Sequence, residues 1–275
     1  MLRVTALYVY PVKSCRGFAV DATAVDARGF VGDRRFLVAD AQGQFLTQRV
    51  HPRMALIETA LTAESLTLAS ADHGSVSIAL SGIRGPKSEI PVAVWKDTVT
   101  ADDCGDEPAQ WLSKFLRLPC RLVRAGSVYS RPVPARKIPA SLGPLAFSPH
   151  EVSFADAFPF LVISEESLAD LNARLATPLP MNRFRPNLVV TGGAPYAEDD
   201  WTRCKIGEVV FHGATRCGRC VVTTTDQLTA ERAQEPLRTL ATYRRDAEGT
   251  VMFGRNLIHE TKTGRLSVGD AVSLL

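Results

Sequence analysis

Arg35–Thr47, with the sequence RFLVADAQGQFLT, consists of two apolar runs on either side of a short polar segment. Residues 35–39 and 44–47 have the character of strands, and Asp40–Gly43 predicts a turn in which Gly43 is free to take a positive φ. Working outward from this hairpin, further strand-like segments follow at 55–62, 65–69, 76–80 and 91–95. The first part of the chain is therefore expected to be mostly β.

The rest of the chain mixes helix and strand signals. Asp106–Leu116 predicts a helix, because its large apolar residues recur at i, i+4. Further strands are expected at 120–124, 160–163, 187–191, 208–212, 220–225 and 271–274, with helices at 165–175, capped by Ser164, and near 236–244. The pattern predicts an α+β class, predominantly β, with two β-barrel-like domains carrying helical insertions. The boundary is expected in a proline-rich segment, which gives domains 1–124 and 125–275.

Composition excludes several classes of protein. The 275 residues are 45% hydrophobic and carry a net charge of +3, which favours neither nucleic acid nor an anionic membrane surface as a partner. No segment approaches the roughly 18 apolar residues of a membrane span, and residues 1–10 alternate like a strand instead of forming a signal peptide. We expect a cytoplasmic protein whose six cysteines are mostly free thiols.

The sharpest chemical feature is Cys217-Gly218-Arg219-Cys220, preceded by Arg216. A structural zinc site normally needs a second ligand pair, which the sequence lacks. A redox dithiol would open a helix, whereas a β-branched strand is expected after this pair. A third interpretation is a single thiolate that holds a metal cofactor, a soft ligand favoured by the flanking arginines. Two small buried apolar residues would also fit the pattern.

Three weaker motifs carry groups suited to anions. Lys13 and Ser14 lie in Tyr10–Gly17 after the first strand, where a Lys-Ser pair and backbone amides can hold a phosphate. Arg34, in Gly32–Phe36, offers a bidentate clamp. Arg185 and Asn187 lie in 182–187 before another strand. Each motif alone is equally consistent with a solvated turn.

Taken together and in order, these motifs resemble the MOSC proteins. The resemblance is to the two-domain type, an N-terminal MOSC β-barrel domain followed by a MOSC domain, which includes the mitochondrial amidoxime-reducing component and its bacterial counterparts. The matching residues are Tyr10–Cys15, Asp33–Arg34, Phe184–Asn187, Tyr196–Asp199 and Cys217–Thr224. They extend over nearly the whole chain, from Val4 to Leu274.

The resemblance implies a molybdenum–molybdopterin cofactor. In that family the second cysteine of the pair ligates molybdenum, which makes Cys220 the implied metal ligand and catalytic residue. The implied cofactor-binding residues are Lys13, Ser14, Arg34, Asp156, Ala157, Phe158, Arg185, Asn187 and Cys220. The chemistry of these residues agrees, since a dianionic phosphate needs several basic donors and a soft metal needs a thiolate.

The family resemblance implies an oxidoreductase that removes oxygen from N-hydroxylated small molecules. Gly193 stands where animal members often carry a cysteine. The four-cysteine ferredoxin domain of many bacterial relatives does not follow Leu275, so electrons are expected from a separate ferredoxin- or flavin-type protein. A cofactor carrier and a sulfur-transfer protein are the alternatives. We also expect the proline-rich segment Ala125–His150 to lie beside the cofactor opening; the alternative is a plain interdomain linker.

Overall fold

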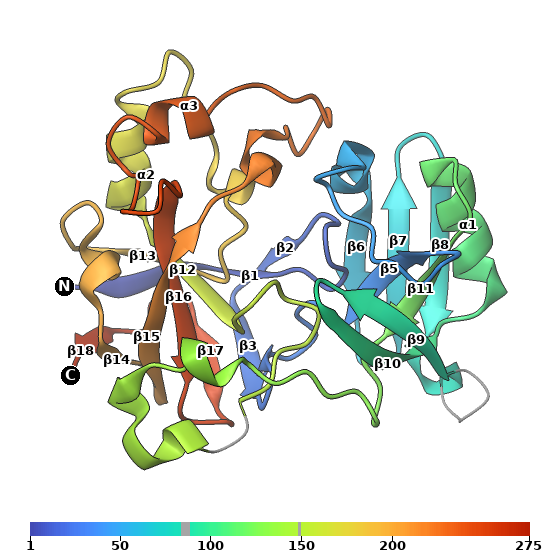
Figure 1. The fold of residues 1–275 in the computed structure, drawn as a ribbon, viewed down its shortest axis with the longest axis horizontal. Coiled ribbons are helices and arrows are strands. Elements are labelled where there is room, and N and C mark those ends of the chain that lie inside the picture. Colours follow the sequence, from blue (N-terminus) through green and yellow to red (C-terminus); the bar gives the residue numbers. More distant parts are fainter. Residues whose placement is uncertain (84–88, 148–149) are drawn as a thin grey trace.

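The computed structural model describes residues 1–83, 89–147 and 150–275. Figure 1 shows two lobes, of which the larger is built on an eight-stranded sheet in the order β18-β14-β15-β16-β12-β13-β1-β2. Its strands are β1 (Arg3–Val9), β2 (Phe18–Val20), β12 (Phe160–Ser164), β13 (Leu188–Thr191), β14 (Arg203–Ile206), β15 (Val209–Gly218), β16 (Met252–His259) and β18 (Val272–Leu274). Neighbours are antiparallel except β12 and β13, which run parallel.

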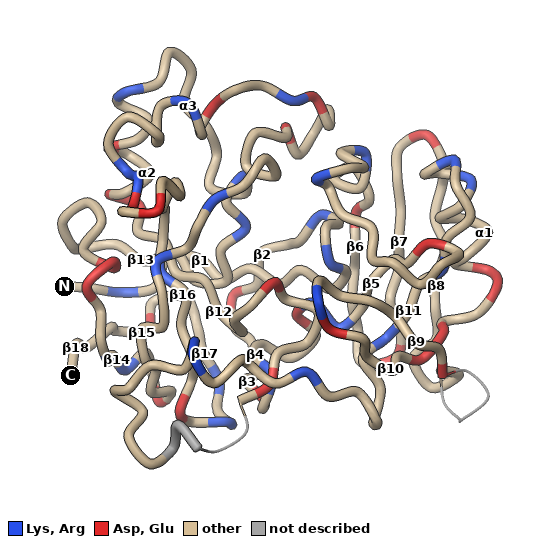
Figure 2. The backbone as a smooth tube through the Cα atoms, viewed as in Figure 1, with Lys and Arg blue, Asp and Glu red and all other residues tan. Residues whose placement is uncertain are grey.

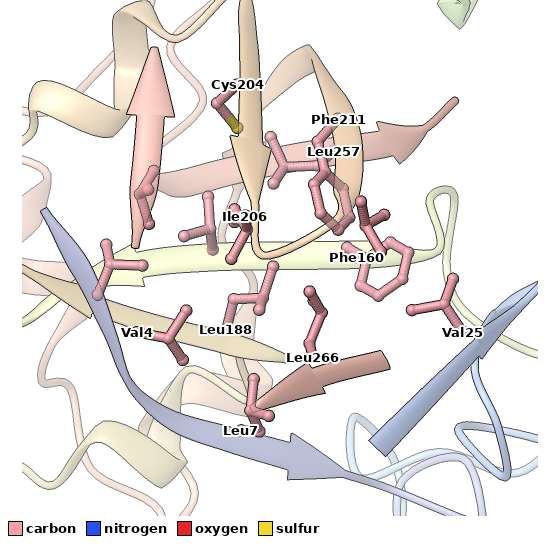
Figure 3. Close-up of a cluster of buried hydrophobic side chains, with 14 of the residues drawn as sticks. Val4, Leu7, Val25, Phe160, Leu188, Cys204, Ile206, Phe211, Leu257 and Leu266 are labelled. Atoms are coloured by element: carbon pink, nitrogen blue, oxygen red, sulfur yellow. The ribbon is translucent and has the colours of Figure 1, made fainter. Parts of the chain in front are cut away.

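The first strands of the chain lie in the lobe of the second half. β1 pairs with β13, with Leu7 opposite Leu188. β3 (Ala22–Asp26) pairs with both β17 (Arg265–Ser267) and β4 (Gly29–Phe30). Figure 3 shows the apolar core that results, in which Leu7 and Leu188 lie near Phe160 from the middle of the sheet. The division at 124/125 stays a prediction, and the strands of residues 1–30 are spatially part of the larger lobe.

The smaller lobe combines two sheets and one helix. One sheet has the order β5-β11-β10-β9 and the other β6-β7-β8. Their strands are β5 (Phe36–Asp40), β6 (Glu58–Leu61), β7 (Ser65–Ser70), β8 (Gly74–Ala79), β9 (Glu89–Val94), β10 (Asp97–Asp103) and β11 (Cys120–Arg124). Helix α1 (Asp106–Leu116) buries Leu112 and Phe115 in this lobe's core. Asp106 and Glu107 lie in its first turn, where their negative charges interact favourably with the positive end of the helix dipole.

Short helical segments connect the strands. α2 (Glu165–Asn172) begins where the Ser164 side chain accepts a hydrogen bond from the Ser167 amide, and α3 (Leu237–Leu240) is a single turn. The 3₁₀ segments are η1 (Pro52–Leu56), η2 (Leu80–Gly82), η3 (Ala135–Lys137), η4 (Ala140–Phe147), η5 (Met181–Arg183), η6 (Ala197–Asp200) and η7 (Val221–Thr224). In the part of the chain that is described, no helix has the length and apolar character needed to cross a membrane.

The structure confirms the predominantly β class and corrects some details. The bounds of α1 and β11 are those predicted, whereas the described sheets are open and not closed into barrels. The strand predicted at 220–225 was wrong, because η7 lies there. The hydroxyls of Thr223 and Thr224 donate to the carbonyls of Cys220 and Val221 at 3.0 and 2.8 Å. Such side-chain bonds to nearby carbonyls compete with strand pairing despite the β-branched sequence.

Candidate functional site

A cavity of about 340 Å³ lies where loops of the two lobes meet. It is lined by all nine residues that the sequence singled out, namely Lys13, Ser14, Arg34, Asp156, Ala157, Phe158, Arg185, Asn187 and Cys220. They come from the loop after β1 and the segments before β5, β12 and β13, and from the end of β15. The fold therefore brings together residues separated by more than two hundred positions, from Lys13 to Cys220. The Tyr196–Asp199 motif does not line this cavity.

Three of the lining residues have a backbone conformation that is uncommon for residues with a Cβ. The φ angles are 68° at Ser14, 49° at Arg34 and 55° at Arg185. Arg34 is held in place by a hydrogen bond of 2.7 Å from its amide to the Tyr10 carbonyl. Left-handed residues that the surrounding structure enforces concentrate at functional sites. All three residues line the cavity.

Tyr10 organises two of these arginines. Its ring contacts the guanidinium groups of both Arg34 and Arg185, with centroid distances of 4.6 and 4.3 Å. Its hydroxyl donates to the Pro186 carbonyl at 3.1 Å, and its amide donates to Asp33 at 2.9 Å. Burial raises the pKa of the Tyr10 hydroxyl well above its usual range, so the ring stays neutral. The buried ring thus fixes the separation of two cations in the wall.

The cavity also holds an ion cluster built on Asp156. Lys13 pairs with one carboxylate oxygen and donates to the Phe154 carbonyl at 2.8 Å, while Arg49 pairs with the other oxygen at 3.0 Å. Burial lowers the pKa of Lys13 to about 8, against the opposing attraction of Asp156. Burial alone would raise the pKa of Asp156, but Lys13 and Arg49 hold that pKa well below its usual range. The cluster remains one positive charge in excess when Lys13 is protonated.

Asn187 links the strands that carry the site. Its side-chain oxygen accepts hydrogen bonds from Arg34 at 3.1 Å and from the Leu161 amide at 3.3 Å, and its side-chain nitrogen donates to the Tyr8 carbonyl. The residue is buried, so these polar groups need the partners they have. It therefore ties β1, β12 and Arg34 together as well as lining the cavity.

The two cysteines of the motif have different surroundings. Arg219 donates to the Cys217 sulfur at 3.1 Å and to the Phe184 carbonyl at 2.6 Å. Cys220 lines the cavity near the Arg49 guanidinium. Burial opposes the charge of Arg49, but Asp156 and, to a smaller extent, Cys220 raise its pKa. Both thiols are partly exposed, which argues against the interpretation that the two cysteines serve only as small buried apolar side chains. Among the described residues no group of three or more His, Cys, Asp or Glu side chains could hold a metal, which weighs against structural zinc.

The cavity is strongly cationic. Its seven basic residues are Lys13, Arg34, Arg49, Lys137, Arg185, Arg216 and Arg219, and Asp156 is the one acid among the described lining residues. In Figure 2 several blue segments from both lobes lie in the middle of the molecule, and others are spread over its periphery. A concave surface with one sign of charge attracts ligands of the opposite sign. The arrangement is suited to a polyanion held beside a free thiol.

Sequence reasoning missed some residues of the site and its support. Arg219 lies inside the cysteine motif but was not selected, Arg49 lies two residues after the opening hairpin, and Lys137 lies in the proline-rich segment. Arg131, from the same segment, donates to the carbonyls of Ala155 and Asp156 at 2.5 and 3.2 Å. Arg131 also pairs with the Asp97 carboxylate at 2.8 Å. A buried arginine whose partners come from distant parts of the chain leaves no signal in a single sequence.

Comparison with known proteins gives two family matches. The MOSC N-terminal beta barrel domain matches residues 1–119, and the MOSC domain matches residues 149–273. Mitochondrial amidoxime-reducing component 1 is 36% identical in Mus musculus and 37% in Homo sapiens, each covering 99% of this chain and 82% of that protein. Molybdenum cofactor sulfurase of Danio rerio is 33% identical over 98% of this chain, which corresponds to 34% of that longer protein.

Proposed function

Since the chain belongs to the family of MOSC proteins with an N-terminal MOSC barrel domain, we propose that it is a molybdenum-cofactor-dependent oxidoreductase that reduces N-hydroxylated compounds. The observation that carries the proposal is the cavity, where seven cations surround one acid and the Cys220 thiol. The amidoxime-reducing relatives align over nearly the full chain, which supports a reductase over a cofactor carrier or a sulfur-transfer protein.

The residues of the cavity fit the cofactor. A phosphate dianion is best bound by several charged donors, and Lys13, Arg34 and Arg185 line one cavity together with Ser14. Burial of Arg185 lowers its pKa, and no described carboxylate forms an ion pair with it, so an external anion would relieve a desolvated cation. Molybdenum accepts a soft thiolate, which Cys220 can supply beside Arg49.

Each residue has a task in this proposal. Lys13, Ser14, Arg34 and Arg185 would hold the phosphate, while Asn187 and the segment Asp156–Phe158 would hold the pterin; Cys220 would be the metal ligand. When bound, the cofactor supplies two-electron oxygen-transfer chemistry, and the protein positions it and the substrate. The overall reaction takes an N-hydroxyl group, two electrons and two protons to the amine or amidine and water. The electrons would come from a separate ferredoxin- or flavin-type protein.

The decisive experiment combines cofactor analysis with a reductase assay. The purified chain should contain about one molybdenum and one pterin per molecule, and should convert an aromatic amidoxime to the amidine with a reduced viologen dye as electron donor. Cofactor without turnover would favour a carrier, and cofactor-dependent transfer of sulfur to a second molybdoenzyme would favour the sulfur-transfer alternative. Absence of both metal and pterin after expression in a host that makes the cofactor would contradict the proposal.

A further inference from the structure

A second, more open cavity lies next to the first, and Arg216 lines both. The other charged residues of the second cavity are Arg244, Arg255, Asp199 and Asp200. Arg244 forms an ion pair with Asp199. Neither Arg216 nor Arg255 has an ion-pair or hydrogen-bond partner for its side chain within the described residues. Two arginines are therefore left without a counterion at the passage between the cavities.

The backbone places these two arginines face to face. Arg216 and Arg255 are direct partners in the antiparallel pair of β15 and β16. Like charges directly opposite each other destabilise a strand pair. The register shifts on both sides of Arg216, between Gly213 and Arg216 and between Arg216 and Gly218. Such irregularities reorient side chains and are frequent next to binding sites.

The guanidinium of Arg255 packs against the backbone at Gly213. A Cβ at Gly213 would lie 1.8 Å from the Trp201 carbonyl oxygen, which by itself requires glycine there, and 2.9 Å from Nε of Arg255. The Nε atom is buried and lacks an acceptor among the described residues. Burial lowers the pKa of Arg255, with Asp199 and Asp200 acting in the opposite direction. A buried donor without an acceptor costs stability, which a bound anion would recover.

We infer that Arg216 and Arg255 form a subsite for an anionic group, a carboxylate or a phosphate, carried by the substrate whose N-hydroxyl end lies in the first cavity. Guanidinium groups match the planar geometry of carboxylates and bind phosphates in the same bidentate way. Because Arg216 lines both cavities, a small molecule can occupy the two at once. The inference rests on the proposed function, since it names a property of the substrate of that site.

The first test compares two substrates in the holoenzyme. The KM values of an aromatic amidoxime and of the same amidoxime with a ring carboxylate are measured with a reduced dye. In the wild-type chain the carboxylate form should have a KM lower by roughly tenfold or more. Arg255→Gln should bring the ratio of the two KM values close to one, while the exposed, unpaired control Arg265→Gln should leave it unchanged. An unchanged ratio in Arg255→Gln would overturn the inference.

A second readout needs no turnover. Calorimetry measures the binding of the two product amidines, with and without the carboxylate, to the wild-type chain and to Arg255→Gln. If reduction fails but the carboxylate amidine loses its advantage only in Arg255→Gln, the subsite stands and the proposed function falls. A nucleotide-extended cofactor, found by mass spectrometry in the wild-type chain and missing from Arg255→Gln, would instead assign the subsite to the cofactor and overturn its assignment to the substrate.

Discussion

The guanidinium of Arg34 donates a hydrogen bond of 3.2 Å to the backbone carbonyl of Arg185, across 151 residues of sequence. The same guanidinium pairs with the Asp33 carboxylate at 2.6 Å, whereas Arg185 donates at 2.8 Å to the Cys15 carbonyl. The charge of Arg34 is thus compensated within the fold. The charge of Arg185 is not compensated by an ion pair with any described residue, and this difference separates their roles.

The first prediction concerns the stability of the cofactor-free chain. Arg34→Gln should lower the free energy of unfolding by about 3–5 kcal/mol, because it leaves the Asp33 carboxylate buried without its partner. Arg185→Gln should cost about 1 kcal/mol, since it removes one hydrogen bond but also a desolvated cation. Urea unfolding of both variants measures the difference. Equal losses would mean that Arg185 is as structural as Arg34.

The second prediction concerns retention of the cofactor. Hydrogen bonds to a charged group contribute about 1.5–3 kcal/mol, so Arg185→Gln should weaken cofactor binding roughly tenfold or more. Lys13→Gln should have an effect of similar size, because both residues line the same cavity. Molybdenum and pterin content after gel filtration gives the readout. The exposed control Arg174→Gln should retain the cofactor like the wild-type chain. If Arg185→Gln and Lys13→Gln lost no more cofactor than this control, convergence on one phosphate would be contradicted.

The third prediction separates the two cysteines. Cys220→Ala should abolish molybdenum-dependent reduction, because it removes the only thiol proposed as metal ligand. Cys217→Ala should keep activity within about fivefold, since Arg219 still donates to the Phe184 carbonyl after the thiol is removed. X-ray absorption at the molybdenum edge should show one sulfur ligand fewer in Cys220→Ala alone. The reverse pattern would move the ligand to Cys217, and loss of activity in both variants would favour a redox dithiol.

Much of the fold and the cavity could be predicted from the sequence, and the limits have physical causes. Asp106–Leu116 was predicted to the residue because the helical period of its apolar residues is a local signal. The left-handed backbone of Arg34 and Arg185 is imposed by tertiary contacts and has no local signal. The strand predicted over η7 failed because two threonine hydroxyls bond to carbonyls of their own turn. The nine site residues were found through the family motifs, which carry long-range information that composition and periodicity lack.

The fourth prediction is a pH dependence that arises from Lys13. Its folded pKa is about 8, below the ordinary value of 10.5, so between these pH values the unfolded chain holds a proton that the folded chain has lost. Stability of the cofactor-free chain should therefore rise with pH across this window, by up to about 3 kcal/mol for this group. Cofactor retention should fall over the same window, because the neutral amine no longer attracts the phosphate.

The contribution of Lys13 is isolated by measuring the free energy of unfolding against pH for the wild-type chain and for Lys13→Met and taking the difference. Burial also lowers the pKa of Lys262 to about 8, which gives a contribution of the same sign in both proteins and cancels in the difference. The stability of Lys13→Met relative to the wild-type chain should thus decrease steadily between pH 8 and 10.5. If the free energies of unfolding of the two proteins changed in parallel with pH over that range, the pH dependence would not arise from Lys13.

The fifth prediction concerns the proline-rich segment, Ala125–His150, of which residues 148–149 lie outside the described part. Arg131 fixes the Ala155 and Asp156 carbonyls, and Lys137 lines the cavity with its amine 5.8 Å from the ring of Phe158. If the segment shapes substrate entry, Lys137→Met should change the KM for the substrate several-fold while leaving the free energy of unfolding within about 0.5 kcal/mol.

The matched control is Arg136→Met, because Arg136 is exposed, lies next to Lys137 and does not line the cavity. Its KM for the small substrate should equal that of the wild-type chain. If the segment also attracts an acidic electron donor, the KM for that protein should rise in Arg136→Met at low salt, and the rise should vanish near 0.5 M salt, where the screening length falls to about 4 Å. Unchanged kinetics in both variants, at low and high salt, would support the alternative that the segment is a linker between domains.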